Sequence, residues 1–105
     1  MAKYVLLYSG GNGVAMTPAE QAALTQLWTA WFTSLGSALV DAGAPFMPAV
    51  AAVTPDGSTN GMGANASGYS IVDAANGDAA IAMARSCPHL KSNGTVTVFP
   101  TIPMM

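Results

Sequence analysis

His89, the only histidine of this 105-residue chain, is the residue best suited to acid–base chemistry. An imidazole changes its charge near neutral pH, so His89 could act as a general base. Glu20, at the predicted start of an antiparallel helix, would supply the carboxylate that orients such an imidazole. The alternative is structural, because a histidine just past a helix end caps carbonyls and favours the negative end of the helix dipole.

Asp41 is the second candidate acid or base. The sequence predicts that it lies in the last turn of the first helix, where a carboxylate opposes the helix dipole by about a few tenths of a kcal/mol. An apolar pocket near Phe46 and Met47 would desolvate this carboxylate and make it usable for proton transfer, whereas solvation would simply make it tolerable. Chain order places Asp41 and His89 at opposite ends of a strand, roughly 17 to 20 Å apart. Only a partner subunit would then assemble them as a catalytic pair.

Aromatic residues of the predicted first helix could border a ligand pocket. Trp28, Trp31 and Phe32 recur at helical spacing, which fits both core packing and the wall of a cleft for a flat organic ligand. Residues of the first strand, the first helix and the segment after that helix are predicted to contact such a ligand: Tyr8, Trp28, Trp31, Phe46 and Met47.

Several other chemistries lack the residues that they need. Pro88 separates Cys87 from His89, and a nucleophile needs its base in contact, so a Cys-His enzyme is not favoured. One cysteine and one histidine cannot fill a tetrahedral zinc site, so we predict no metal and no cofactor. Glycines at positions 10, 11 and 13 lack the remainder of a dinucleotide or phosphate-loop motif and indicate a turn.

Charge and hydropathy limit the partners. Charged residues make up 8% of the chain and apolar residues 51%. The 3 Lys and Arg side chains form no basic stripe, so nucleic acid is not predicted as a partner. Residues 42–53, the longest apolar stretch, contain two prolines and fall short of the about 20 residues that span a membrane. The short apolar start and the single cysteine favour the cytoplasm.

Two helices are predicted from their capping residues. A capping box at residues 17–20 begins the first helix, and Gly43 would end it. Asn76 or Asp78 would cap the second helix, which Pro88 would end.

Four strands are predicted around these helices, in the order β-α-β-β-α-β. The predicted strands comprise residues 3–9, 45–53, 69–73 and 95–99, with a flexible glycine-rich loop at residues 54–67. Because a proline cannot donate to a ladder, the second strand should lie at a sheet edge. This order suits one α+β domain, residues 1–105, with a four-stranded antiparallel sheet and both helices on one face. A second copy would cover the other face and make a homodimer, because the surface is so poor in charge.

Three segments resemble the YCII-related proteins: MAKYVLLYSGG at the start, SGYSIVDA in the centre and CPHLKSNGTVTVFP near the end. The resemblance covers almost the whole chain and implies a ferredoxin-like fold that pairs as a dimeric α/β barrel. That group includes cofactor-free monooxygenases, and a His and Asp pair is suggested to act in some YCII-related members. Here the first helix carries Trp28, Trp31 and Phe32 instead of that histidine, and residues 56–58 lack the Pro and Phe of an Asp-Gly-Pro-Phe branch.

Two functions follow from these patterns. The first is a small-molecule enzyme of lyase or oxygenase type, free of metal and cofactor, that acts on an apolar or aromatic substrate between helices and sheet. The second is a non-catalytic metabolite-binding or regulatory dimer that uses the same pocket, which the shortage of acids and bases favours. Replacing His89 and Asp41 by Ala would remove turnover from a catalyst while leaving its ligand binding intact.

Overall fold

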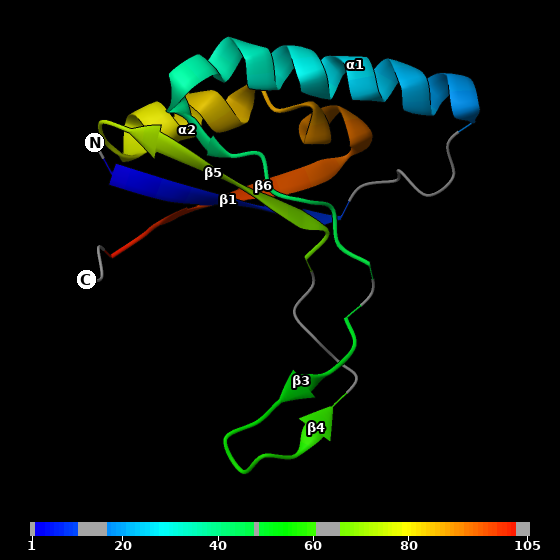
Figure 1. The fold of residues 1–105 in the computed structure, drawn as a ribbon, viewed down its shortest axis with the longest axis vertical. Helices are drawn as coiled ribbons and strands as arrows, with labels where there is room; N and C mark the ends of the chain where they lie inside the picture. Colours follow the sequence, from blue (N-terminus) through cyan, green and yellow to red (C-terminus); the bar gives the residue numbers. More distant parts are fainter. Residues whose placement is uncertain (1, 11–16, 48, 61–65, 103–105) are drawn as a thin grey trace.

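The chain folds into a sheet covered on one side by two helices, with a hairpin that projects from the other side (Figure 1). A computed structural model describes residues 2–10, 17–47, 49–60 and 66–102. The principal elements are β1 (Ala2–Gly10), α1 (Pro18–Leu35), β2 (Leu39–Asp41), β3 (Ala52–Val53), β4 (Thr59–Asn60), β5 (Gly68–Ala74), α2 (Gly77–Arg85) and β6 (Gly94–Pro100). Two short 3-10 helices, η2 (Gly36–Ala38) and η3 (Pro88–Ser92), follow α1 and α2.

The main sheet has four antiparallel strands in the order β2-β5-β1-β6. Both helices lie on the same side of it (Figure 1). The predicted α+β class, with a four-stranded antiparallel sheet and two helices, is confirmed, and the arrangement is compatible with a ferredoxin-like fold. A second sheet, the two-stranded β3–β4 hairpin, was not predicted.

Helix α1 begins as predicted and ends earlier. The capping box is present, because the Thr17 hydroxyl accepts from the Glu20 N–H at 3.2 Å and the Glu20 carboxylate accepts from the Thr17 N–H at 3.3 Å. The predicted end at Gly43 is wrong. Gly36 caps the helix with φ 56°, a conformation that costs glycine little because it has no Cβ. The apolar spacing continues beyond this point, and that continuation made the helix look longer than it is.

The predicted second strand, residues 45–53, is also wrong. The edge strand is β2, whose Leu39 and Asp41 pair with Val72 and Ile71 of β5. Pro45 forms only an isolated bridge to Gly68, in keeping with a residue that has no N–H to donate. The end of the predicted strand pairs instead within the hairpin, as β3. Part of the predicted loop at residues 54–67 is therefore the turn and second strand of that hairpin, and its residues 61–65 lie outside the described ranges.

The remaining predicted elements are confirmed with small shifts at their ends. Strands β1, β5 and β6 cover the residues predicted for the first, third and last strands. The Asn76 side chain caps α2 by accepting from the Ala79 N–H at 2.9 Å. Pro88 follows the end of α2 and starts η3, in which His89 lies.

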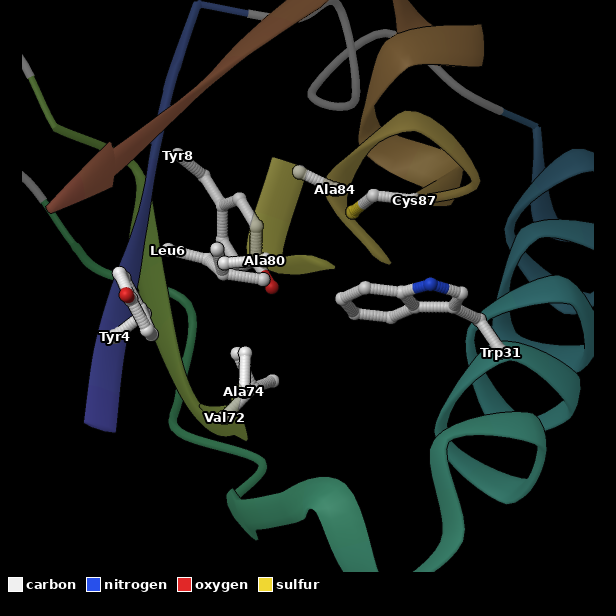
Figure 2. Close-up of a cluster of buried hydrophobic side chains, with 9 residues drawn as sticks. All are labelled: Tyr4, Leu6, Tyr8, Trp31, Val72, Ala74, Ala80, Ala84 and Cys87. Carbon is white, nitrogen blue, oxygen red and sulfur yellow. The ribbon is translucent and has the colours of Figure 1, made fainter. Parts of the chain in front are cut away.

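Strict alternation along the strands divides the sheet into a core face and an open face. The core lies between the sheet and the helices (Figure 2), and consists of Tyr4, Leu6, Tyr8, Trp31, Val72, Ala74, Ala80, Ala84 and Cys87. Alternate residues of the same strands point to the other side. We call these ten residues of β1, β5 and β6 the open face: Lys3, Val5, Leu7, Ser9, Tyr69, Ile71, Asp73, Thr95, Thr97 and Phe99.

Candidate functional site

A cleft of about 380 Å³ lies between α1, the end of β1 and the segment after β2. Four aromatic residues line it, and small residues of α1, of residues 42–45 and of position 67 complete the wall. The aromatic residues are Tyr8, Trp28, Phe32 and Tyr69. This volume falls within the roughly 300 to 1,000 Å³ that small-molecule pockets occupy.

The rings of the cleft are held by contacts with one another. Trp28 and Phe32 are four residues apart on α1 and therefore project from one helix face, with ring centroids 5.6 Å apart. Trp28 also meets Tyr8 of β1 edge to face, at 5.2 Å and 74°. Edge-to-face contacts are a preferred arrangement of aromatic pairs, so they fix the rings that a ligand would meet.

Trp31 belongs to the core and not to the cleft. It is 4% exposed, and its indole N–H donates to the Met83 carbonyl at 3.2 Å and to the Ser86 hydroxyl at 3.0 Å. Figure 2 shows its ring reaching from α1 toward the other buried side chains. Of the two roles considered for the tryptophans, Trp28 has the one at the cleft and Trp31 has the one in the core.

Tyr8 is a hydrogen-bond donor beneath the cleft. Its hydroxyl donates to Ser70 Oγ at 2.6 Å, and Ser70 Oγ donates in turn to the Ala42 carbonyl at 2.7 Å. Burial raises the pKa of Tyr8 above its ordinary value, which the hydrogen bond with Ser70 offsets only in part. The phenol therefore keeps its proton at neutral pH and does not serve as a base.

Asp41 lies in the edge strand β2, so its predicted place in the last helical turn is wrong and the dipole argument does not apply. The carboxylate is exposed. It accepts from the Gly43 N–H at 2.8 Å and from the Tyr69 hydroxyl at 3.3 Å. Phe46 packs on Tyr69 with centroids 5.9 Å apart, and Met47 is 87% exposed. Neither residue is among those that line the cleft, so Asp41 is not enclosed by the apolar pocket considered for it.

Gly43 lines the cleft at a position where only glycine fits. Its φ is 75°, and a Cβ added there would collide with the Tyr69 carbonyl. The segment that forms one wall of the cleft therefore approaches β5 as closely as the absence of a side chain permits. Phe32 was considered with the tryptophans as a possible wall of a cleft and does line it, whereas Tyr69 and Ser67 were not anticipated and enter the cleft only through the pairing of β5 with β1.

His89 lies at the far end of β1, as chain order predicted. Its Nε2 is 2.8 Å from the Ser9 carbonyl oxygen, and its ring lies 5.3 Å from that of Tyr8. Glu20, the carboxylate considered as its partner, is instead bonded to Thr17 in the capping box. His89 thus contacts a carbonyl of a strand, and it is not among the residues that line the cleft.

Asp41 and His89 do not meet within one subunit. Asp41 pairs with Ile71, which pairs with Val5 of β1, and His89 contacts Ser9 four residues farther along that strand. Strand spacings of about 4.8 Å and rises of about 3.4 Å per residue place the Asp41 backbone roughly 17 Å from that of Ser9, the residue that His89 contacts. A catalytic pair formed across a dimer stays a prediction.

The remaining reactive groups offer little further chemistry. Burial raises the pKa of the Cys87 thiol, so it stays protonated and is a poor nucleophile. Within the described ranges, no three His, Cys, Asp or Glu side chains gather as ligands for a metal ion. None of the helices described in the structure has the length and hydropathy needed to cross a membrane. No protein-family model matches the chain, and no curated protein matches it either.

Proposed function

We propose that this protein binds a small, flat, apolar or aromatic molecule in the cleft and acts as a binding module without catalysis. The observation that carries the proposal is the cleft itself, in which four aromatic residues line a volume suited to a small ligand. Such rings attract a flat apolar ligand through dispersion and offset or edge-on stacking, at about 0.5 to 1.5 kcal/mol for each well-placed aromatic pair.

The positions of the titratable groups favour binding over catalysis. His89 and Asp41 lie outside the cleft lining, and the environments of Tyr8 and Cys87 keep their protons in place. A ligand in the cleft would therefore meet rings and small side chains. Among the described residues that line the cleft, the titratable side chains are the phenols of Tyr8 and Tyr69.

An enzyme of the YCII-related kind, free of metal and cofactor, is the second candidate. One contact favours it: Tyr69 lines the cleft, and its hydroxyl donates to the Asp41 carboxylate at 3.3 Å. A carboxylate bonded to a phenol at the edge of a cleft could accept a proton from a bound substrate through that phenol. Under this alternative Asp41→Asn would abolish turnover and leave binding unchanged, whereas a binding module would show no turnover to lose.

The proposal also includes a homodimer in which two open faces meet and form a dimeric α/β barrel of ferredoxin-like subunits. Support comes from the composition of the open face, where Val5, Leu7, Ile71 and Phe99 form an apolar centre. Phe99 is 47% exposed in the single chain. A second copy would bury these side chains on the face that no described helix covers.

A pair of variants on α1 tests the binding proposal. Thr29 lines the cleft and Thr33 does not, yet both hydroxyls donate to the carbonyl four residues earlier, at 3.0 Å and 2.8 Å. Thr29→Phe should fill the cleft and weaken binding of 1-naphthol at least about tenfold in NMR titrations, while the matched Thr33→Phe should keep the wild-type affinity. Absence of binding by the wild type, or an equal loss in both variants, would overturn the proposal.

A further inference from the structure

We infer that the hairpin arm, residues 49–60, clasps a second copy of this chain packed on the open face. The inference rests on the dimer of the proposed function and names the segment that would hold it together. Figure 1 shows the arm, with β3 and β4 in green, leaving the body on the side of the sheet opposite to α1 and α2. A copy that covered the open face would therefore lie beside the arm.

The arm carries an apolar run that its own hairpin leaves uncovered. Residues 49–53 read Ala-Val-Ala-Ala-Val, and Val50 and Val53 are 98% and 70% exposed. The hydrogen bonds described for the arm join its own residues, mainly in the turn between Thr54 and Ser58. Consecutive exposed apolar residues on a projecting segment are a liability in a monomer and are typical of an interface.

The chain exposes more surface than a compact monomer of its size. A globular protein of 10.6 kDa has an accessible surface of about 5,500 Å², whereas this chain has 7115 Å². Its radius of gyration is 15.2 Å, against about 13 Å for a compact domain of this length. A specific interface covers roughly 800 Å² on each partner, so the excess surface is large enough to supply one.

The open face offers one contact surface for such an interface. Its strands β2, β5, β1 and β6 have 3, 7, 9 and 7 residues, which at about 4.8 Å between strands and about 3.4 Å per residue cover a plane of roughly 420 Å². The arm is an exposed apolar segment on the same side of the sheet and would add a second contact surface. Residues 49–53 span about 17 Å when extended, and stacked sheets lie about 10 Å apart, so the arm is long enough to pass the gap and reach the flank of the partner.

A second copy fits these surfaces better than a different protein. Each copy has one open face and one arm. In a two-fold symmetric dimer the two open faces would pair and each arm would contact the other copy, so both surfaces would be covered in both copies. The arm has one charged residue, Asp56, whose carboxylate is already bonded to Thr54 and Ser58 of its own turn. It therefore presents no charge pattern for an oppositely charged partner to recognise.

Sedimentation equilibrium of the full chain tests the inference. Val50→Asp combined with Val53→Asp puts charges where the arm would contact the partner, and both sites are exposed in the single chain, so folding should persist. We expect the dimer dissociation constant to rise at least about 100-fold in this variant. Leu27→Asp, at a 41% exposed site on α1, is the control and should leave the constant unchanged.

The possible results distinguish a failure of the proposed arm contact from a failure of the proposed dimer. A wild-type chain that is monomeric at all concentrations overturns both, while the cleft titration stays independent of either result. A wild-type dimer that the arm variant does not weaken overturns the clasp alone. A nitroxide on Val50→Cys gives a second readout, since Cys87 is buried and should not react. Its spectrum should be immobilised in the dimer, and a freely mobile label would also overturn the clasp.

Discussion

The division between Trp28 and Trp31 makes a quantitative prediction about stability. Trp31→Phe removes an indole N–H that donates to the Met83 carbonyl and the Ser86 hydroxyl. Ser86 Oγ itself donates to the Met83 carbonyl at 3.0 Å, so that carbonyl keeps a partner and the lost hydrogen bonding costs only about 1 kcal/mol. Phenylalanine is also smaller by roughly 40 Å³, which adds about 1 kcal/mol at 24 cal/mol per Å³ of cavity, besides the lost transfer energy.

Trp31→Phe should therefore lower the free energy of unfolding by about 2 to 3 kcal/mol. Trp28→Phe is the matched variant, and its cost should stay below about 1.5 kcal/mol because Trp28 is half-buried beside an open cleft. Urea titrations followed by far-UV circular dichroism measure both without relying on either indole. A smaller loss for Trp31→Phe than for Trp28→Phe would refute the assignment of Trp31 to the core and Trp28 to the cleft.

Two further predictions concern the segment and the phenol that frame the cleft. Gly43→Ala should lower the free energy of unfolding by at least about 2 kcal/mol in a thermal or urea melt, because an alanine at φ 75° is strained and its Cβ meets the Tyr69 carbonyl. Gly77→Ala is the control, and it should leave the free energy of unfolding unchanged because a Cβ there meets nothing. Since burial raises the pKa of Tyr8, its stabilisation is present below the unfolded pKa of about 10 and is lost above it, by up to about 1.4 kcal/mol per pH unit. In a Cys87→Ala background, Tyr8→Phe should remove this alkaline slope; an unchanged slope would contradict the burial argument.

Local signals in the sequence were sufficient for most of the sheet and for the helix starts. The capping box at Thr17 and the Asn76 cap depend on neighbouring residues alone, and both are formed as predicted. The end of α1 was missed because apolar spacing continues past Gly36, while the helix ends at this one glycine, whose φ is 56°. Chain order also predicted correctly that His89 lies by Ser9.

The cleft could be predicted only in part, because it is made by contacts between distant segments. Tyr8 and Trp28 were proposed as ligand contacts and do line it, while Phe46 and Met47 lie outside its lining. Nothing in the spacing of the two tryptophans says which one faces α2. That choice depends on the rotation of α1, which tertiary contacts such as the one between Trp31 and Met83 determine.

The most direct measurement is a set of intermolecular NOEs from 1-naphthol bound to the isotope-labelled protein. If the cleft binds flat apolar molecules, the naphthol protons should show NOEs to the Trp28 indole and to the Thr25 methyl group, both of which line it. NOEs confined to Val5, Leu7 and Phe99 would place the ligand on the open face of the sheet and would contradict the proposed binding site.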